Sequence, residues 1–525
     1  MTNHLHLAPV LVVGAGIMGA GIAQVAAQAG HTVFLFDLRE GAAASAKSRL
    51  ASTFDGLVAK GKLGLEAAQA TMARIEAVAH LQAAASAHLV VEAIVEQLDA
   101  KRSLFRQLEA VVSETAVLAT NTSSISVTAI ANGLQHPERL VGMHFFNPVP
   151  LMKLVEVVSG LQTAPAVAQA IFELSQAWGK VPVHARSTPG FIVNRIARPY
   201  YAETLALLLE QAAPPEVLDA CLRAVGFRMG PCELMDMIGH DTNFAVTQSV
   251  FDANFQDKRF SPSLVQREMV DGGLLGRKSG RGFFCYPPGA AVWAAPPLQA
   301  LALPASLVVH GQGALADGLA QAATASLQTA VAREPRSPWT GLAIDGGRLV
   351  LCHGQTASAL ALQSAQTKVA VFDRFNPAAL AMTARPTAVA PPRALAYAVA
   401  DSSSVAWQAQ AAACLAALGF IPLRLSDVPG LVVTRTLAML INEAADAVIQ
   451  GVCSADAADA AMKLGLNYPQ GPFEWLAGWG AAGVVATLDA LDAHYRGERY
   501  RVSPGLRRQA QLQLLQQSEP LRAQR

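Results

Sequence analysis

Residues 9–19 read PVLVVGAGIMG, a short apolar run that passes directly into a glycine-rich turn. A segment of helical composition follows from Ala20 to Ala29, and a second apolar run, residues 31–36, ends in Asp37. Strand, turn, helix and strand in this order predict a parallel βαβ unit with a tight glycine turn after its first strand. This stretch therefore decides the fold of the first part of the chain.

The three glycines of this turn have separate steric tasks. Gly14 permits the tight turn, Gly16 lets the backbone approach a pyrophosphate, and Gly19 lets the helix pack on the strand. Asp37 lies where an acid accepts both ribose hydroxyls and repels a 2′-phosphate, which favours NAD over NADP, although Arg39 is near enough to weaken that preference. The alternative is a Rossmann fold that has lost its ligand. The residues expected around the dinucleotide are Gly14, Ala15, Gly16, Ile17, Met18, Gly19 and Asp37.

Apolar runs continue to alternate with segments of helical composition along the next hundred residues. Residues 89–95 and 116–119 read as strands, and residues 101–112 read as a helix between them. Such alternation predicts parallel strands joined by crossover helices. We therefore expect an α/β Rossmann-type, doubly wound sheet in this part of the chain.

The composition of the 525-residue chain is that of a globular protein of roughly three or four domains. Hydrophobic residues make up 52% and charged residues 15%, and the net charge is +1, so there is no bulk electrostatic case for binding nucleic acid. The sequence shows neither a long apolar span nor a signal-peptide pattern, so we expect no membrane association and a cytoplasmic location. The six cysteines show no metal-ligand spacing, and no metal site is expected.

Four basic residues gather after the second predicted strand, namely Lys47, Arg49, Lys60 and Lys62. They form either a solvated helical face or a site for the phosphorylated tail of a substrate, and the sequence favours neither interpretation.

The chain contains an internal repeat. Three pairs of segments match in order and spacing: residues 188–195 with 428–435, 230–234 with 471–475, and 259–264 with 501–506. Both copies are rich in Ala and Leu with helical periodicity and Pro and Gly at the breaks, which predicts two all-α domains.

A Pro- and Ala-rich stretch from about Pro287 to Pro392 separates the two helical copies. It contains strand-like runs and a turn, residues 311–316 GQGALA, that nearly repeats the first glycine turn, but no acid closes a second strand at the proper distance. We therefore expect a degenerate, truncated Rossmann-like segment here. The expected domains are residues 1–186, 187–286, 287–400 and 401–525.

Residues 142–156, GMHFFNPVPLMKLVE, contain the side chains best suited to chemistry. The segments on either side of the Pro-rich turn read as short strands. Two adjacent strands would bring Glu156 beside the His144 ring, where a carboxylate fixes one imidazole tautomer and leaves the other nitrogen as a general base near neutral pH. The alternative for this pair taken alone is a core histidine without a catalytic role.

The nucleotide turn, the segment Asn121-Thr122-Ser123-Ser124, the HFFNP segment and the PGFIVNR segment follow one another within residues 1 to about 286. In this set of motifs the chain resembles the L-3-hydroxyacyl-CoA dehydrogenase family. The second helical copy is similar to the duplicated C-terminal domain of long bacterial members, including those of phenylacetate and hydroxybutyryl-CoA metabolism. The resemblance implies NAD-dependent interconversion of (S)-3-hydroxyacyl-CoA and 3-oxoacyl-CoA in fatty-acid or aromatic-acid degradation.

The resemblance also implies roles for individual residues. His144 takes the role of catalytic base and Glu156 that of its orienting partner. Ser123 and Asn194 match polar contacts to an oxygen of the substrate, although each taken alone is also suited to a helix cap or a turn. The further residues that match positions around the cofactor are Glu96, Lys101, Ser123, Asn147 and Lys278, of which Ser123 and Asn147 also face the substrate.

Two rival functions and one structural expectation accompany this interpretation. One rival is a related dehydrogenase of a free hydroxy acid or sugar acid, and the other is a non-catalytic protein that keeps the fold. In the second copy Thr434 replaces Asn194 and no counterpart of HFFNP precedes it, so we expect that copy to be catalytically silent. We expect it to pack on the first copy within one chain, imitating the dimer of the shorter family members.

Overall fold

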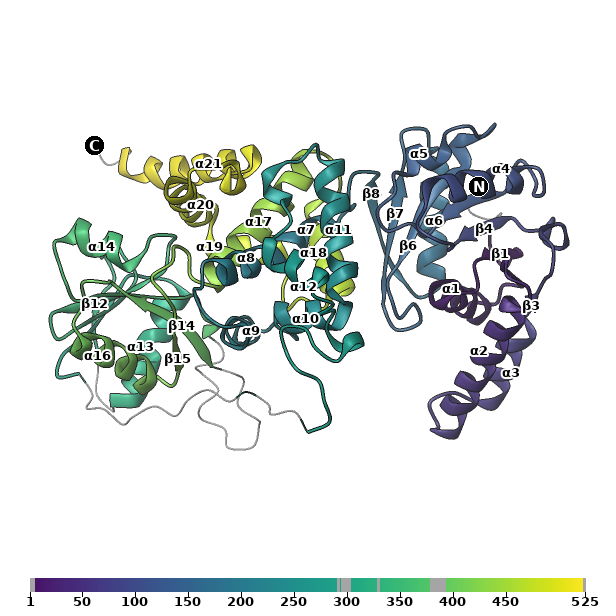
Figure 1. The fold of residues 1–525 in the computed structure, drawn as a ribbon. Coiled ribbons are helices and arrows are strands. Elements are labelled where there is room, and N and C mark those ends of the chain that lie inside the picture. The colour runs from purple at the N-terminus through teal and green to yellow at the C-terminus, as the bar shows by residue number, and fades with distance from the viewer. Residues whose placement is uncertain (1–4, 290–292, 294–303, 328–330, 378–392, 523–525) are drawn as a thin grey trace. The chain divides into compact units, whose positions relative to one another are not determined.

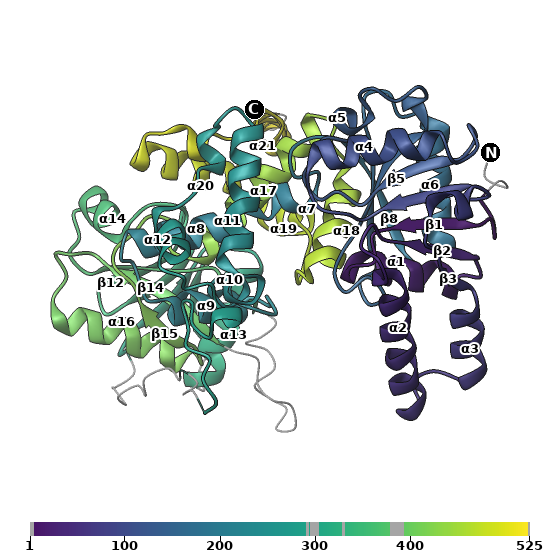
Figure 2. The same cartoon turned by 45° about the vertical axis from the view of Figure 1, so that its right-hand side comes forward.

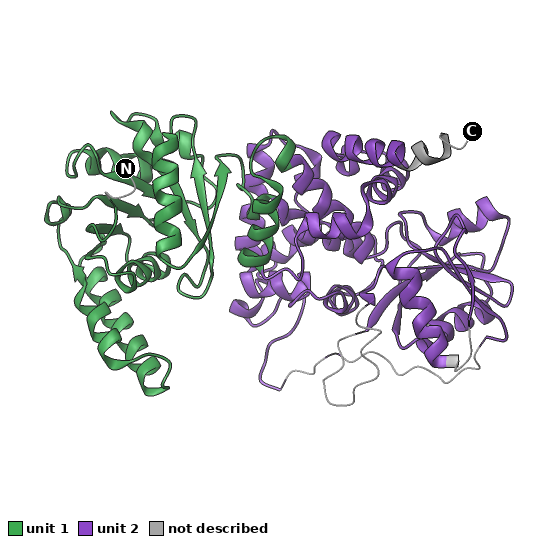
Figure 3. Ribbon diagram, turned by 180° about the vertical axis from the view of Figure 1, so that it is seen from behind, with its two compact units in different colours: residues 1–195, 447–466 green, residues 196–446, 467–525 purple. Residues whose placement is uncertain are grey.

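The computed structural model describes residues 5–289, 293, 304–327, 331–377 and 393–522 (Figure 1; Figure 2 shows the same ribbon turned by 45°). The chain forms two compact units, and neither unit is one continuous stretch of sequence (Figure 3). Unit 1 consists of residues 1–195 and 447–466, and unit 2 of residues 196–446 and 467–525. Part of the second helical copy thus belongs with the first sheet.

Unit 1 is built on an eight-stranded sheet in the order β3-β2-β1-β4-β5-β6-β7-β8. The strands are β1 (Val10–Val13), β2 (Val33–Phe36), β3 (Ile75–Ala77), β4 (Leu89–Glu92), β5 (Val117–Thr120), β6 (Leu140–Phe145), β7 (Leu154–Ser159) and β8 (Val181–Arg186). Strands β1 to β6 run parallel, β7 runs antiparallel to β6, and β8 runs parallel to β7. The strand order reverses between β1 and β4, where sheets of this kind bind ligands.

Helices connect and cover these strands. They are α1 (Ile17–Gln28), α2 (Ala42–Ala59), α3 (Leu65–Ala73), α4 (Leu98–Glu109), α5 (Val127–Ala131), α6 (Pro165–Ala177), α7 (Val193–Ile196) and, from the second helical copy, α18 (Ala455–Leu466). Helices α2 and α3 lie side by side and extend away from the sheet (Figure 2). Strands β1, β4 and β5 are completely buried, as expected for the nearly continuous apolar sequence of central parallel strands.

Unit 2 contains a seven-stranded sheet in the order β10-β9-β11-β12-β13-β14-β15. The strands are β9 (Leu307–His310), β10 (Ala332–Glu334), β11 (Gly341–Ile344), β12 (Gly347–Leu351), β13 (Val369–Phe372), β14 (Ala394–Val399) and β15 (Ile421–Arg424). The helices that accompany them are α13 (Ala314–Leu327), α14 (Ala357–Ser364) and α16 (Val405–Ala417).

This second sheet repeats the strand order of the first without a counterpart of β3 and with one strand reversed. Strand β13 is antiparallel to β14, and β14 is parallel to β15, as in the β6-β7-β8 edge of unit 1. Strand β11, however, runs antiparallel to β9, whereas β4 runs parallel to β1. The cause is the two-residue turn Asp345-Gly346, whose positive φ angles of 43° and 78° close a hairpin where unit 1 has a crossover helix.

The two helical copies make up the rest of unit 2. The first copy contributes α8 (Arg198–Leu209), α9 (Pro215–Ala224), α10 (Pro231–Ile238), α11 (His240–Ala253) and α12 (Leu264–Asp271). The second contributes α17 (Val433–Ile449), α19 (Pro472–Trp479), α20 (Ala481–Tyr495) and α21 (Pro504–Arg522). Among the described residues, no helix is both long and apolar enough to cross a membrane.

The predicted fold class is confirmed: a Rossmann-type doubly wound sheet, a helical domain, a degenerate Rossmann-like sheet and a second helical domain. The boundaries differ in places. The helix expected at residues 101–112 is α4, which begins earlier, at Leu98, with Asp99 in its first turn. An acid in the first turn is stabilised by the helix dipole, and this signal marks the true start.

Candidate active site

The glycine turn after β1 has the geometry that the sequence predicts. Gly14 has a φ of +106°, and a Cβ atom there would lie 2.4 Å from the carbonyl oxygen of Ala93. A Cβ atom on Gly19 would lie 1.8 Å from the carbonyl oxygen of Gly14, so α1 packs on the turn only because residue 19 has no side chain. A Cβ atom on Gly16 would meet no described atom within 4 Å. This open space fits a ligand that approaches the backbone at the N-terminus of α1.

Asp37, directly after β2, ties this turn to the neighbouring strand. Its carboxylate accepts the backbone N–H of Ala15 at 2.8 Å and the Nε–H of Arg39 at 3.1 Å. Burial by itself raises the pKa of Asp37, but the hydrogen bonds from Arg39 and Ala15 outweigh it and hold the pKa below its ordinary value. A charged carboxylate therefore stands beside the turn at neutral pH. Ile17 and Met18 form the first turn of α1, with the Ile17 side chain exposed.

His144 and Glu156 are direct cross-strand neighbours on β6 and β7, which confirms the predicted pairing. The Nδ1 atom of His144 lies 2.6 Å from a carboxylate oxygen of Glu156, and both residues are buried. Phe146 and Phe191 pack on the imidazole, with ring centroids 4.5 and 6.0 Å away. The carboxylate fixes the tautomer that carries its proton on Nδ1. Within the described part of the chain Nε2 has no hydrogen-bond partner, so it is the basic nitrogen.

The second oxygen of Glu156 has a structural task. It accepts the backbone N–H groups of Ile192 and Val193, each at 3.0 Å, where the PGFIVNR segment turns into α7. A buried carboxylate with both oxygens occupied is held in one position. Glu156 therefore fixes the imidazole and, at the same time, the segment that carries Asn194.

Glu96 brings together the residues that follow β5. One of its oxygens accepts the hydroxyl of Thr122 at 2.6 Å and the backbone N–H of Ser123 at 2.8 Å. Burial by itself raises the pKa of Glu96, but the Lys101 ammonium and these hydrogen bonds outweigh it and lower the pKa. The amide of Asn194 donates to the carbonyl oxygen of Ser123 at 3.3 Å. Ser123 and Asn194 are thus neighbours, as a shared role requires.

Lys101 is buried and lies behind the site. Its ammonium is 2.6 Å from Glu92 and 3.2 Å from Glu96, and only 1% of its side chain is exposed. Because Lys101 is buried against two carboxylates, it contacts the segment around Ser123 only indirectly, through Glu96.

The remaining two predicted cofactor residues lie in different units. Asn147 is an exposed residue of unit 1, two positions after the end of β6. Lys278 belongs to unit 2, where its ammonium pairs with Asp241. The place of both residues at the cofactor stays a prediction.

Two polar residues of this region had no predicted role, Glu92 and Asn121. Glu92, the last residue of β4, accepts the hydroxyl of Thr120 at 2.7 Å as well as the Lys101 ammonium. The side-chain carbonyl of Asn121 accepts the N–H of Phe145 at 2.8 Å and so ties the end of β5 to β6. The sequence offers a signal for both residues, because each is a polar residue at the carboxyl end of an apolar strand, Glu92 at the end of β4 and Asn121 directly after β5.

A matching corner in unit 2 corrects the expectation that nothing in the second half corresponds to HFFNP. Residues 373–377, DRFNP, follow β13 directly. Asp373 donates its backbone N–H to the carbonyl oxygen of Ala396 on β14, so these two residues stand where His144 and Glu156 stand in unit 1. The match between HFFNP and DRFNP is hard to see in the sequence because the two segments share only Phe-Asn-Pro.

The Asp373 side chain takes over the structural task of Glu156. Its carboxylate accepts the backbone N–H groups of Val432, Val433 and Thr434 at 2.6 to 2.8 Å, together with the Thr434 hydroxyl. The second corner therefore keeps the carboxylate at the start of its helix but has no imidazole.

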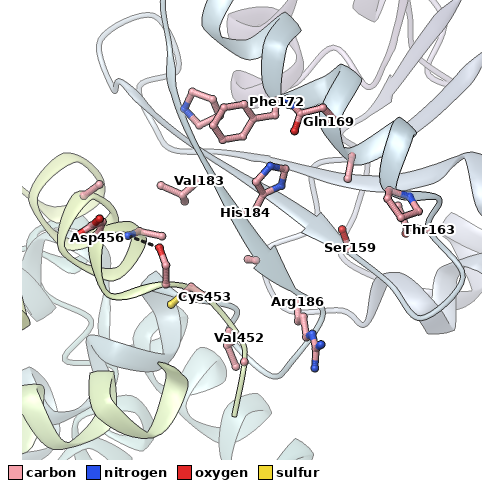
Figure 4. A pocket seen from close by; sticks show the side chains of 18 of the residues that line it. Ser159, Thr163, Gln169, Phe172, Val183, His184, Arg186, Val452, Cys453 and Asp456 are labelled. Atoms are coloured by element: carbon pink, nitrogen blue, oxygen red, sulfur yellow. Dashed lines mark hydrogen bonds between the residues drawn. The ribbon is translucent and has the colours of Figure 1, made fainter. Parts of the chain in front are cut away.

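A cavity of about 880 Å³ in unit 1 is lined by residues of β8, of α18 and of the segment before α18 (Figure 4). His184 and Phe172 line it and stack on each other, with ring centroids 4.5 Å apart. None of the predicted site residues is among its described lining residues, so it is not the candidate active site.

The residues after β1, β4 and β5 and the His144 imidazole near the end of β6 all gather at the carboxyl edge of one parallel sheet, which is typical of NAD-dependent oxidoreductases. The chain belongs to the 3-hydroxyacyl-CoA dehydrogenase family. The family model for the NAD binding domain matches residues 9–188, and the model for the C-terminal domain matches residues 190–286 and again 430–521. The double match confirms the predicted repeat.

Individual relatives agree with this membership. The chain is 43% identical over 510 residues to 3-hydroxyadipyl-CoA dehydrogenase of Escherichia coli (strain K12). The matched region covers 97% of this chain and 98% of that protein. It is 42% identical over 276 residues to a probable 3-hydroxybutyryl-CoA dehydrogenase of Deinococcus radiodurans, covering 52% of this chain and 99% of that protein. A crystal structure of 3-hydroxybutyryl-CoA dehydrogenase from Escherichia coli K12 matches with a TM-score of 0.86 and 42% identity, covering 97% of this chain and 99% of that one.

Proposed function

We propose that this enzyme interconverts (S)-3-hydroxyacyl-CoA and 3-oxoacyl-CoA with NAD, and that His144 is its catalytic base. The observation that carries the proposal is the 2.6 Å contact between His144 Nδ1 and Glu156, which leaves Nε2 as the basic nitrogen. In the direction of oxidation, Nε2 accepts the hydroxyl proton of the substrate while Glu156 stabilises the imidazolium that forms. When bound, NAD supplies the hydride acceptor: it takes the hydride from the carbon that carries this hydroxyl.

Three polar residues position the substrate in this proposal. Ser123 and Asn194, which touch through a 3.3 Å hydrogen bond, present a hydroxyl and an amide to the substrate's reacting oxygen or its thioester. Asn147, at the end of the HFFNP turn, contacts both the nicotinamide and the substrate. Holding the β-carbon in one pose fixes the stereochemistry of the hydride transfer.

The open space at Gly16 and the carboxylate at Asp37 support the proposed cofactor site. The pyrophosphate approaches the backbone of the turn, and Asp37 accepts the ribose hydroxyls and disfavours a 2′-phosphate. The cofactor-binding residues of this proposal are Gly14, Ala15, Gly16, Ile17, Met18, Gly19, Asp37, Glu96, Lys101, Ser123, Asn147 and Lys278.

The names of the similar proteins support an acyl-CoA as substrate but differ in acyl group. The curated relative from Escherichia coli K12 bears the name 3-hydroxyadipyl-CoA dehydrogenase, and the crystal structure from the same strain bears the name 3-hydroxybutyryl-CoA dehydrogenase. We propose that this chain accepts short and dicarboxylic acyl groups, in fatty-acid or aromatic-acid degradation of the phenylacetate type. Measuring kcat/KM over a panel from acetoacetyl-CoA to 3-oxoadipyl-CoA ranks these substrates.

The rival substrate class is a free hydroxy acid or sugar acid. Basic side chains on and after α2 favour a phosphorylated CoA tail, because Arg49, Lys60 and Lys62 are exposed there and Lys47 is half-buried. Turnover of acetoacetyl-CoA with no turnover of acetoacetate is the expected result. Equal turnover of both compounds contradicts the CoA assignment.

We also propose that the two helical copies imitate a dimer within one chain. Two hydrogen bonds in separate units support this arrangement because they are related by exchange of the copies. In unit 1, Arg186 at the end of β8 donates its backbone N–H to Val452 at 2.9 Å. In unit 2, Ser426 after β15 donates its backbone N–H to Ala212 at 3.0 Å. Each helical copy thus contributes a hydrogen bond to the edge of the other copy's sheet.

We propose domain boundaries after residues 186, 286 and 400. A truncated protein that lacks residues 401–525, and so the whole last domain, tests the arrangement. The expected product is insoluble or dimerises with concentration, since the helical face of the first copy loses its cover. A monomeric, fully active truncation contradicts the proposal. We further propose a cytoplasmic location, which fractionation of cells that express the chain tests.

A further inference from the structure

Unit 2 contains a cavity of about 430 Å³ beside the DRFNP segment, residues 373–377. Its walls come from the start of α13, from α17, from α19 and from this segment. Helices α17 and α19 begin at the second-copy counterparts of the PGFIVNR and GPCEL segments. The cavity, which we call the second-half pocket, is therefore built from the degenerate counterparts of the catalytic elements, and its volume lies within the roughly 300–1,000 Å³ of small-ligand sites.

The side chain that distinguishes the second-half pocket is Arg374. Its guanidinium carbon lies 3.9 Å from the centroid of the Trp479 ring, and both residues line the pocket. Burial lowers the pKa of Arg374 to about 10, with the carboxylate of Asp373 opposing part of that shift. In the corresponding position of the first half stands Phe145, which is buried in the core between sheet and helices. A cation at this position is thus a feature of the second half alone.

The guanidinium of Arg374 has no carboxylate partner among the described residues. Neighbouring Asp373 does not pair with it, because that carboxylate is occupied by the N–H groups of residues 432–434 and by the Thr434 hydroxyl. Two other buried arginines of unit 2 are paired, Arg259 with Glu443 at 3.1 Å and Arg435 with Glu203 at 3.1 Å. A partly desolvated cation that faces a cavity without a counter-ion is stabilised by an anion entering from solvent.

The rest of the wall provides apolar surface and little opposing charge. Val433 and Leu437 of α17 and the two indole rings of α19, Trp475 and Trp479, line the pocket. The one carboxylate among its described lining residues, Glu474, accepts the backbone N–H of Gly471 at 2.9 Å. An anionic group on an apolar body is complementary to such a wall.

The pocket has neither the base nor the dinucleotide contacts of the first half. Asp373 occupies the position of His144, with its oxygens already engaged. The carbonyl oxygen of Glu334 accepts the N–H of Gly311 just as that of Phe36 accepts the N–H of Gly14, so the residue in the place of Asp37 is Pro335. A ribose therefore has no acid to accept its hydroxyls.

We propose that the second-half pocket is a non-catalytic binding site for a small organic anion, whose carboxylate or phosphate pairs with Arg374 while its apolar part packs on Trp479 and Leu437. The planar guanidinium suits bidentate contact to either group. This inference does not depend on the proposed dehydrogenase reaction, since it involves none of the residues assigned to that reaction.

Calorimetric titration of the full-length protein tests the proposal, with adipate, butyryl-CoA and pyrophosphate as separate probes. The titrations compare the unchanged protein with Arg374→Met, which removes the charge but keeps the length of the side chain. A matched control is Arg348→Met, because Arg348 also stacks on a tryptophan, Trp339 at 5.5 Å, but lies outside the pocket. The melting temperature and kcat with acetoacetyl-CoA are measured on every variant.

The expected result is that at least one probe binds to the unchanged protein and that Arg374→Met weakens this binding by about tenfold or more. Arg348→Met binds as the unchanged protein does, and kcat stays within about twofold in both variants. Binding of adipate identifies a carboxylate ligand, and binding of pyrophosphate a phosphate. For butyryl-CoA, which also enters the active site, the expected change is from two bound molecules per chain to one. No binding of any probe beyond the active site, or equal affinities in the Arg374→Met variant, overturns the proposal.

Discussion

Two corners at the same register of the two sheets perform one structural task with different side chains. In unit 1, Glu156 on β7 holds the N–H groups of Ile192 and Val193 and contacts Nδ1 of His144 on β6, whose Nε2 has no partner among the described residues. In unit 2, Asp373 takes the position of the histidine and holds the corresponding N–H groups itself, opposite Ala396. The carboxylate at the helix start is kept in both halves, whereas the imidazole is kept in one.

The same difference extends to the surrounding strands. Glu96 and Lys101, which support the segment around Ser123, lie on the crossover between β4 and β5. In unit 2 that crossover is replaced by the Asp345-Gly346 hairpin, so the second sheet has no place for either residue. Among the described residues, the second half therefore has the carboxylate contacts at the helix start and lacks counterparts of His144, Glu96 and Lys101.

Replacing the imidazole should have the largest effect on activity. With His144→Gln we expect kcat for acetoacetyl-CoA reduction to fall by about 10²–10⁴-fold, because the proton donor and acceptor is lost while the amide keeps the shape. Asp373→Asn is the matched control in the other corner, and its kcat should stay within about twofold. Steady-state kinetics on folded protein decide both, and a loss of activity in the control would mean that the second corner takes part in catalysis.

Breaking the ion cluster between the helical copies should cost stability in place of activity. Glu203 of the first copy lies 3.1 Å from Arg435 and 2.9 Å from Arg499 of the second. Glu203→Gln leaves the buried Arg435 and the half-buried Arg499 without this partner, so we expect the free energy of unfolding to fall by about 3 kcal/mol. Denaturant titration at neutral pH measures this free energy, and a change below about 0.5 kcal/mol would mean that the cluster does not stabilise the fold.

The direction in which the free energy of unfolding changes with pH also depends on Glu203. Burial by itself raises the pKa of Glu203, but Arg499 and Arg435 outweigh it and lower the pKa below its ordinary value of 4.5. A carboxyl with a depressed pKa contributes stability that is present above pH 4.5 and is lost as the pH falls through the folded-state pKa. Acid unfolding should therefore be less steep in Glu203→Gln than in the unchanged protein.

A smaller loss of stability is expected when the helix start of the second half loses its carboxylate. Asp373→Ala leaves the N–H groups of Val432, Val433 and Thr434 buried without an acceptor, which should cost about 1–3 kcal/mol. Thermal unfolding measures this, with Asp401→Ala as a control on the same sheet, because Asp401 is exposed and follows β14. A stability equal to that of the unchanged protein would contradict the structural role of Asp373.

The smallest effect is expected at the surface of the nucleotide turn. Arg39 is largely exposed and pairs with Asp37, so Arg39→Ala should change the KM for NADH by less than about threefold. The KM for NADPH should be higher in Arg39→Ala than in the unchanged protein, because the side chain that could accommodate a 2′-phosphate is removed. A variant that gains activity with NADPH would contradict the assignment of Arg39.

Much of the first half could be predicted because its signals are local. The order of glycines at 14, 16 and 19 sets the turn, and the alternation around His144 and Glu156 sets their pairing on adjacent strands. The DRFNP segment escaped prediction because its identity to HFFNP is limited to three residues and only the register of β13 and β14 reveals the match. The exchange that places α18 with the first sheet is a tertiary contact, which no local pattern encodes.

We propose that the first half of the chain carries the cofactor site and the chemistry, and that the second half carries neither. The number of NADH molecules bound per chain tests it most directly, measured by fluorescence titration of the unchanged protein and of Gly16→Val. A Cβ atom at residue 16 would meet no described atom within 4 Å, so the valine side chain starts in open space and blocks the approach of a pyrophosphate. We expect one bound NADH per chain in the unchanged protein and none in the variant. Two bound molecules in the unchanged protein, or one remaining in Gly16→Val, would contradict it.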